Sequence, residues 1–379
     1  VYSGGSRARC CGRPTGRVSS AGTAPGTTIG PVEPVSAGRM MTDPNDRRPA
    51  ELTGALRRRV AEEGFDGCGV APARPPARDV GRLEWWIAGG HHASMHWMER
   101  HLAPRRDPDL LLPGCRHVVL VTLGYHRDDP DPEPGRGRVA RYARGRDYHR
   151  VMAKRLRRVA SWLADETGEP ARAFVDTGPV LERAYAERAG LGWIGKNSCL
   201  IDRARGSWFL IGEILTAAVL VDDVGPGADH CGSCNACIEA CPTGAILEAG
   251  VIDARRCVSY WTIEHRGPIP VGVRRGIGSW MFGCDDCQTV CPWNRTFAAE
   301  APPDGPFEFR DELRDLDPAA VLTLDDDGFR ERFAGTPLMR SRRDGLRRNA
   351  CVVLGNLGNR RSVPALVGAL TDDDAVVRS

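Results

Sequence analysis

The sequence predicts an α/β domain, followed by a cysteine-rich domain and a C-terminal segment of paired helices. Three observations support this prediction. Strand-like and helix-like segments alternate over residues 50–225, eight of the 14 cysteines fall between Cys231 and Cys291, and a helical apolar stripe returns after residue 341. The length of 379 residues is enough for two or three domains of ordinary size. No apolar run approaches the ~18–20 residues of a membrane span, so we expect no membrane contact.

Residues 1–48 are predicted to be a disordered extension. They are rich in Gly, Ser, Thr, Pro and Arg, and they have no periodic apolar face that could build a core. They also lack the continuous apolar stretch of a secretory signal, so a cytoplasmic protein is expected. Cys10 and Cys11 lie in this extension and are not expected to be ligands.

Residues 49–225 are predicted to form the α/β domain. Leu52, Leu56 and Val60 recur every four residues, which is typical of an amphipathic helix. Short runs rich in β-branched and apolar residues indicate buried strands. The predicted elements are a helix ending at Gly64, a strand at 115–124, a helix along 148–163, a strand at 171–177, a helix from Pro179 to Gly190, and one or two strands at 208–221. Strands that alternate with helices indicate an α/β domain.

The cysteines of residues 226–298 follow the spacing of a bacterial ferredoxin. The first run, C-x2-C-x2-C-x3-C-P, ends at Pro242, and a second, C-x2-C-x3-C-P, ends at Pro292. In such runs the fourth cysteine binds the other of two clusters. We therefore expect a ferredoxin-like domain with two [4Fe-4S] clusters and crossed ligands: Cys231, Cys234, Cys237 and Cys291 for the first, and Cys241, Cys257, Cys284 and Cys287 for the second. Two all-cysteine zinc sites are the alternative, but zinc ribbons favour separated C-x2-C pairs. The remaining cysteines of the folded part are expected to be small buried hydrophobes: Cys68, Cys115, Cys199 and Cys351.

Residues 299–340 are rich in Pro and Asp and are predicted to be a connector. Beyond it, apolar stripes predict two helices, so residues 341–379 are expected to form a HEAT-like unit. Solenoids need about three repeats for stability, so we expect a truncated array or a unit docked on the preceding domain, and we favour truncation. Arginines open this segment, where they could contact tRNA phosphates or form a solvated helix face: Arg340, Arg342, Arg343, Arg347 and Arg348.

Three dense polar motifs lie at the ends of predicted elements: RYARGRDYH at 141–149, VDTGPVLER at 175–183 and AGLGWIGKN at 189–197. No G-x-G-x-x-G motif follows a strand near the start of the domain, so a dinucleotide-binding fold is unsupported. In this order, before the two cysteine runs and the HEAT-like helices, the motifs closely resemble those of the epoxyqueuosine reductase family. The resemblance covers residues 50–379.

The resemblance implies a cobalamin-dependent oxidoreductase with two [4Fe-4S] clusters and a catalytic domain similar to cobalamin-processing and nitroreductase-like α/β folds. Such an enzyme reduces epoxyqueuosine to queuosine at the wobble position of tRNA, with Co(I) attacking the epoxide. A flavodoxin- or ferredoxin-type electron donor and a monomer are also expected. The alternatives are a corrinoid reductive dehalogenase, which the missing twin-arginine signal disfavours, and a non-catalytic ferredoxin-type electron carrier, which would leave the α/β domain without a role.

Asp176 matches the proton donor of the family. Epoxide opening leaves an alkoxide, and a carboxylic acid can protonate it if a secluded site raises its pKa. The other interpretation of Asp176 is a cap of the helix at Pro179. By resemblance, the cobalamin contacts are Arg105, Asp176, Asn197, Leu200, Ile211, Ser259 and Asp285. Arg141, Tyr142 and residues 147–149 could face the substrate or anchor the next helix. Glu182 and Arg183 are expected to make ordinary surface or interdomain pairs.

Overall fold

A computed structural model describes residues 44–127, 133–223, 225, 228–298, 300–301, 305, 307 and 309–379. These residues belong to one compact unit, Asp43–Ser379. Most of the predicted N-terminal extension, including Cys10 and Cys11, lies outside the described residues. None of the described helices is long and apolar enough to cross a membrane.

A four-stranded antiparallel sheet forms the centre of the α/β part. Its order is β1 (Gly67–Pro72), β2 (His117–Gly124), β7 (Phe209–Thr216) and β4 (Ala171–Phe174). The central strands β2 and β7 are runs of valine, leucine and isoleucine, which suit positions covered on both faces. The strands predicted in the three segments at 115–124, 171–177 and 208–221 are confirmed.

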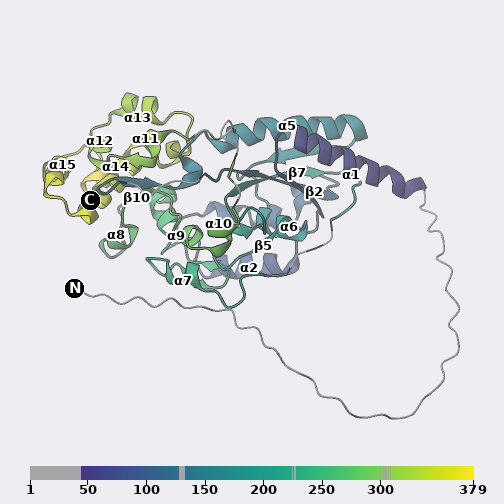
Figure 1. Cartoon of the computed structure of the whole chain (residues 1–379), viewed down its shortest axis with the longest axis horizontal. Helices are drawn as coiled ribbons and strands as arrows, with labels where there is room; N and C mark the ends of the chain where they lie inside the picture. Colours follow the sequence, from purple (N-terminus) through teal and green to yellow (C-terminus); the bar gives the residue numbers. More distant parts are fainter. Residues whose placement is uncertain are drawn as a thin grey trace, which may run out of the picture. The chain divides into compact units, whose positions relative to one another are not determined.

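Helices cover both faces of this sheet (Figure 1). α1 (Pro44–Glu62) and α5 (Tyr148–Thr167) pack on one face, where Leu56 and Leu156 are fully buried. α6 (Glu182–Arg188) covers the other face through the fully buried Tyr185. α1 begins at Pro44, earlier than the predicted boundary at residue 48, and a proline is well tolerated in a first helical turn.

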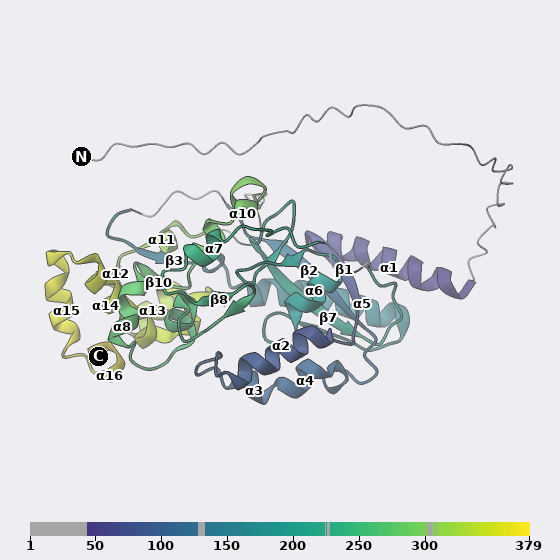
Figure 2. The same cartoon turned by 90° about the horizontal axis from the view of Figure 1, so that it is seen from below.

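Shorter helices lie beside the sheet and lead into the polar motifs. α2 (Ala77–Ala88), α3 (Trp97–Arg100) and α4 (Leu102–Arg106) lie together (Figure 2). The 3₁₀ turns η1 (Pro108–Leu110) and η2 (Arg141–Ala143) precede β2 and α5. The hairpin of β5 (Trp193–Ile194) and β6 (Leu200–Ile201) carries the third polar motif.

The cysteine-rich segment consists of short elements. They are α7 (Ala236–Glu239), the hairpin of β8 (Ile246–Glu248) and β9 (Val251–Ile252), the π-helical turn η3 (Tyr260–Glu264), α8 (Val271–Ile277), β10 (Trp280–Phe282), α9 (Asp286–Thr289) and α10 (Pro292–Thr296).

A second sheet connects this segment to the rest of the chain. Its central strand β3 (Gly137–Val139) pairs in parallel with β10 and antiparallel with β11 (Asp315–Leu316). The predicted connector contains further helical elements: α11 (Asp311–Arg314), α12 (Pro318–Leu322), α13 (Asp326–Phe333) and the 3₁₀ helix η4 (Pro337–Ser341). Its aspartates explain the difference, because Asp317 and Asp325 cap helices rather than mark a solvated linker.

α14 (Arg342–Leu357) is the central helix of the C-terminal part. Its buried Leu346 and Val353 share a core with Phe282 of β10 and Phe333 of α13. After the 3₁₀ turn η5 (Arg360–Ser362), α15 (Val363–Ala369) and α16 (Ala375–Arg378) follow. The two predicted helices are present, and their assignment to a HEAT-like repeat stays a prediction.

Candidate active site

Asp176 lies in the turn between β4 and α6, and its carboxylate is contacted by the first turn of α5. The hydroxyl of Tyr148 donates to Oδ2 of Asp176 at 2.7 Å, and Nε2 of His149 lies 3.3 Å from the same oxygen. Asp176 itself has a φ of 56°, in the left-handed region that non-glycine residues seldom adopt. Two motifs that are distant in the sequence thus meet at one carboxylate.

The interpretation of Asp176 as a helix cap is wrong. α6 begins at Glu182, not at Pro179, and its N-cap residue Leu181 makes no capping hydrogen bond through its side chain. The contact runs in the opposite direction, because the backbone N–H of Asp176 donates to Oε1 of Glu182 at 3.0 Å. The carboxylate of Asp176 is therefore left for Tyr148 and His149.

His149 lies between two carboxylates. Its Nδ1 atom is 2.8 Å from Oδ1 of Asp147, which also caps α5 by accepting the N–H of His149. Burial would lower the pKa of His149, but the hydrogen bonds to Asp147 and Asp176 outweigh it and raise this pKa to about 9. The interpretation of Asp147 as a helix anchor is confirmed, and Tyr148 and His149 contact the candidate acid, while their position toward the substrate stays a prediction.

The pKa of Asp176 differs from the sequence-based expectation. Burial acts to raise it, but the hydrogen bonds from His149 and Tyr148 hold the pKa below its ordinary value. In the chain alone, the proton of the His149–Asp176 pair therefore resides on the imidazole at neutral pH. The expectation of a raised pKa at Asp176 is wrong, because the proton is kept on the neighbouring ring.

Two carboxyl groups lie next to the Asp176 turn, that of the half-buried Glu182 and that of the buried Glu213. Glu213 of β7 is completely buried, and among the described residues neither of its carboxyl oxygens accepts a hydrogen bond from a backbone or side-chain N–H. Its carboxyl group lies within hydrogen-bond reach of that of Glu182. Burial, followed by the charge of Asp176, raises the pKa of Glu182 to about 8. Burial and the charge of Glu182 raise the pKa of Glu213 well above its ordinary value, so both carboxyl groups hold a proton at neutral pH.

An open cavity lies beside the Asp176 turn. Asp176 and Glu182 line it together with Arg105 of α4 and the tryptophans Trp86 and Trp97. Arg105 is only 6% exposed, and its guanidinium donates to the carbonyl of His101 at 3.0 Å without an ion-pair partner among the described residues. A buried cation beside aromatic walls suits a large ligand that brings acceptors.

The other predicted cobalamin contacts do not line this cavity. Leu200 and Ile211 pack in the core between the sheet and α6. Asn197 is buried and donates to the carbonyl of the predicted ligand Cys287 at 3.3 Å. Asp285 is also buried and accepts the backbone N–H of Arg141 at 2.8 Å. Ser259 is half-buried and contacts the predicted ligand Cys257. Of the set, only Arg105 and Asp176 line the cavity, and all seven stay predictions.

The eight clustered cysteines lie in two groups of four. Within each group the thiols are close enough for their charges to interact; the groups are Cys231, Cys234, Cys237 and Cys291, and Cys241, Cys257, Cys284 and Cys287. These are the sets that crossed ligation predicts, and thiolates at such positions are the usual ligands of [4Fe-4S] clusters. Cys199 interacts with members of both groups, so it lies nearer to the cluster sites than a residue of the apolar core would.

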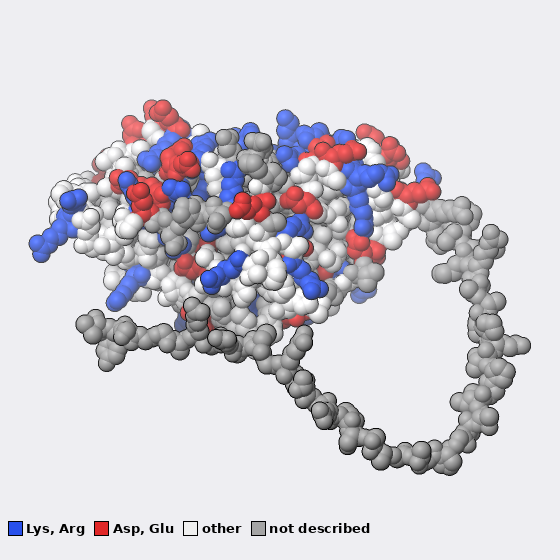
Figure 3. Space-filling view, viewed as in Figure 1, with Lys and Arg blue, Asp and Glu red and all other residues white. Residues whose placement is uncertain are grey.

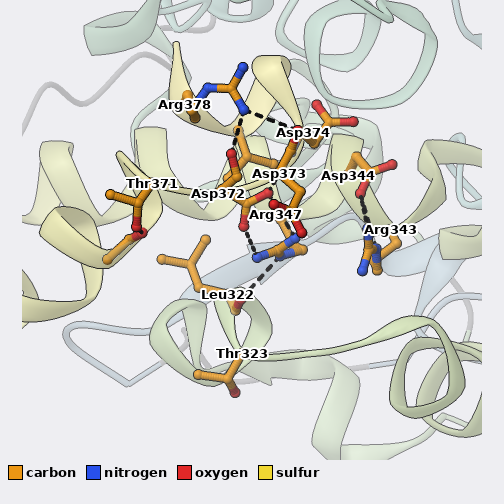
Figure 4. Close-up of polar contacts among 12 residues, drawn as sticks. Leu322, Thr323, Arg343, Asp344, Arg347, Thr371, Asp372, Asp373, Asp374 and Arg378 are labelled. Carbon is orange, nitrogen blue, oxygen red and sulfur yellow. Dashed lines mark hydrogen bonds and ion pairs between the residues drawn. The ribbon is translucent and has the colours of Figure 1, made fainter.

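Most of the C-terminal arginines have partners within the chain. Arg348 is 3% exposed and donates to the carbonyl oxygens of three residues, Trp261, His265 and Gly267, so it is not available to a phosphate. Arg347 binds Asp372 and the carbonyl of Leu322 (Figure 4). On the face seen in Figure 3, basic and acidic side chains are interspersed.

Arg340 differs from these arginines. Its guanidinium pairs with Glu264 at 3.0 Å, its side chain is 55% exposed, and its charge acts on Asp176 and Tyr148. A cation that is both accessible and near the candidate acid is suitable for contact with a polyanionic substrate.

Sequence reasoning missed the roles of Glu182 and Glu213. Glu182 follows the Gly-Pro turn on the same motif as Asp176, which is a local indication of a return contact. Glu213 is the one charged residue in the apolar segment FLIGEILT, and such a residue in a buried strand points to a polar partner.

Comparisons with known proteins identify the family of this chain. A family described as "4Fe-4S double cluster binding domain" matches residues 230–294, and "Epoxyqueuosine reductase QueG, DUF1730" matches residues 105–177. An epoxyqueuosine reductase of Xanthomonas campestris pv. campestris is 42% identical over 338 residues, which are 87% of this chain and 94% of the relative.

Two solved structures are similar over most of the chain. A crystal structure of an epoxyqueuosine reductase with an epoxyqueuosine-modified tRNA-Tyr stem loop has 30% identity and a TM-score of 0.79, and covers 86% of this chain and 88% of that one. The Bacillus subtilis epoxyqueuosine reductase, with its catalytic aspartate loop swung out of the active site, has 29% identity, the same TM-score of 0.79 and the same coverage of 86% and 88%. The chain belongs to the epoxyqueuosine reductase family.

Proposed function

We propose that this chain reduces epoxyqueuosine to queuosine in tRNA, with Asp176 giving a proton to the epoxide oxygen as the ring opens. The observation that carries the proposal is the Asp176 carboxylate on a cavity wall, in contact with a protonated His149. The proton moves from Nε2 of His149 to Oδ2 of Asp176 and on to the substrate oxygen, which becomes a hydroxyl group. Formation of the double bond of queuosine then requires this oxygen to leave as water, so that two electrons and two protons are consumed overall. Tyr148 orients the carboxylate during this transfer through its 2.7 Å hydrogen bond.

The residues present fit cobalamin and two [4Fe-4S] clusters. Arg105, buried without a carboxylate partner among the described residues, suits a cofactor that carries amide and phosphate oxygens. The two groups of four cysteines suit the clusters. Asp285 directly follows Cys284 in the sequence, and Ser259 is two residues after Cys257. When bound, reduced cobalamin supplies the nucleophile for the epoxide and the clusters supply the electrons. The protein residues then bind the cofactor, orient the acid and hold its proton.

The substrate and partners follow from this chemistry. The relative crystallised with an epoxyqueuosine-modified stem loop supports tRNA as the substrate. Arg340 is proposed to contact a phosphate near the wobble nucleotide, because it is exposed beside Asp176. A flavodoxin- or ferredoxin-type donor, a cytoplasmic location and a monomeric state complete the proposal, with the C-terminal helices as a HEAT-like unit.

The rival functions are not favoured. A relative that shares 42% identity over 87% of the chain is an epoxyqueuosine reductase, and a reductive dehalogenase has no support of this strength. A simple electron carrier would not need the Asp147–His149–Asp176 arrangement.

The test is turnover of the natural substrate. The protein is loaded with both clusters and cobalamin, supplied with a reductant and incubated with tRNA that carries epoxyqueuosine. Mass spectrometry of the nucleosides is expected to show queuosine in place of epoxyqueuosine. Loaded protein that leaves epoxyqueuosine unchanged would refute the proposed function.

A further inference from the structure

We propose that Glu182 and Glu213 form a proton-sharing latch that holds the Asp176 turn in its active position. Both are positioning residues, since they act on the backbone of the acid rather than on the substrate. The inference rests on the proposed role of Asp176, and it assigns a role to a carboxyl pair that the chemistry at the epoxide does not use.

The first part of the latch is the bond between the turn and α6. A non-glycine residue at a φ of 56° is held there only when its surroundings determine its conformation. For Asp176 the determining contact is its N–H, which donates to Oε1 of Glu182 at 3.0 Å. Because Glu182 is the first residue of α6, the turn is tied to a helix packed on the central sheet.

The second part of the latch is the contact of the Glu182 side chain with Glu213 on the central sheet. Glu213 projects from β7 on the α6 side of the sheet, where its strand neighbours Ile211 and Leu215 pack in the core. An ionised carboxylate without donors at a fully buried position is very unfavourable. Glu213 is therefore protonated, and its O–H can donate to an oxygen of the Glu182 carboxyl group, which lies within reach. This bond fixes the Glu182 side chain and leaves Oε1 for Asp176.

The latch depends on the shared proton. The groups that face the pair are Asp176 on the turn, Arg183 on α6, Arg105 on α4 and Tyr148 on α5. At neutral pH both members of the pair hold a proton, so the pair is uncharged and Asp176 is the ionised carboxyl group of the three. Loss of these protons would place three carboxylates together, so the turn is expected to be released in alkaline solution.

The kinetic test compares Glu182→Ala with Glu182→Gln in the enzyme loaded with clusters and cobalamin. Glu182→Ala removes the acceptor of the Asp176 N–H, so kcat should fall about 10–100-fold while KM for tRNA and cofactor content stay unchanged. Glu182→Gln keeps an oxygen at the same place and should restore kcat to within about threefold of wild type. Glu187→Ala is the matched control. Glu187 lies on the same helix as Glu182 and also accepts a backbone N–H, that of Ile194 on β5, but among the described residues it forms no hydrogen bond with Asp176.

The outcomes separate this inference from the proposed function. Wild-type turnover in Glu182→Ala, together with an inactive Asp176→Asn, would overturn the latch alone. An equal loss in Glu182→Gln and Glu182→Ala would also overturn it, since charge and not position would then matter. Full activity of Asp176→Asn would instead refute the role of Asp176 on which the latch rests.

A second measurement does not depend on activity. Infrared difference spectra of wild type against Glu213→Gln at pH 7 should contain the C=O band of a protonated carboxyl group, which the variant lacks. The difference is needed because burial also raises the pKa of Asp285. If Glu213→Gln does not fold, Glu182→Gln should shift the band, because the acceptor changes from a carboxyl group to an amide. If Glu213→Gln does not remove the band and Glu182→Gln does not shift it, the proposed hydrogen bond between Glu213 and Glu182 is refuted.

Discussion

The Nε2 atom of His149 lies 3.3 Å from Oδ2 of Asp176, and this contact keeps the proton of the pair on the imidazole. Asp147 holds the other ring nitrogen at 2.8 Å, so the imidazole keeps its proton and Asp176 is ionised in the chain alone. The proposed role of Asp176 therefore does not need a carboxylic acid with a raised pKa. It needs a carboxylate that receives a proton from one hydrogen bond away and passes it to the substrate.

Asp176→Asn should abolish most of the turnover without loss of cofactors. The amide can still accept the hydrogen bond of Tyr148, so both clusters and cobalamin should remain bound, but it cannot pass on a proton. General acid catalysis contributes about 10²–10⁴-fold, and turnover should fall by that factor. Queuosine formation is measured in single-turnover assays. Asp327→Asn is the control, since its side chain is 94% exposed on α13; a comparable loss in both variants would contradict the role of Asp176.

The raised pKa of His149 predicts a pH dependence of stability. Its folded pKa of about 9 is above the ordinary value of 6.5. His149 therefore stabilises the fold fully below about pH 6.5, and this contribution is lost as the pH rises through about 9. Urea unfolding of wild type and His149→Gln should give free energies of unfolding that converge between these pH values. His96→Gln, at a largely exposed histidine, is the control, and a constant difference for His149→Gln from pH 6 to pH 10 would refute the prediction.

Crossed ligation predicts which cysteines share a cluster. Cys291→Ala should damage the same cluster as Cys231→Ala, whereas Cys257→Ala should damage the other one. EPR spectra of the reduced proteins distinguish these losses. Cys351 lies on α14, outside both groups, so Cys351→Ala is the control and should leave both signals intact. Identical spectra of Cys291→Ala and Cys257→Ala, with the first cluster intact, would disprove the ligand assignment.

Arg340 is predicted to contact tRNA. Arg340→Gln should weaken tRNA binding and lower the slope of log K against log salt by about 1, because one phosphate contact is lost. Filter binding at several salt concentrations measures both quantities. Arg330→Gln is a matched control on α13 with a 66% exposed side chain. An unchanged salt slope in Arg340→Gln would exclude this contact.

Local spacing predicted much of the fold and of the site. Three of the four strands of the central sheet, the long helix α5 and the pattern of the cysteines follow from apolar periodicity and from short-range motifs, whereas β1 was not predicted. The partners of Asp176 could not be predicted in this way, since Tyr148 is 28 residues away and meets it only after β4 has joined the sheet. Glu213 belongs to the same class, because its burial is set by the packing of α6 on β7.

The helices within residues 299–340, which were predicted only as a connector, were missed for a related reason. Aspartates at a helix N-terminus and aspartates in a solvated linker have the same composition, and only the buried partners of Phe329 and Phe333 distinguish the two. Arg348 is a second example, because its charge suggested a surface position while its donors satisfy carbonyl groups inside the fold.

The pairing of strand β3 limits how such an enzyme can be divided into separate domains. One neighbour of β3, β10, belongs to the cysteine-rich segment, and the other, β11, belongs to the stretch before the C-terminal helices. Excision of residues 226–298 as a portable electron-transfer module would leave one edge of β3 bare and would remove Phe282 from the core beneath α14. Recombination at the apparent domain boundary should therefore yield two insoluble fragments, and variants that exchange cluster properties are better built by point substitution within the intact chain.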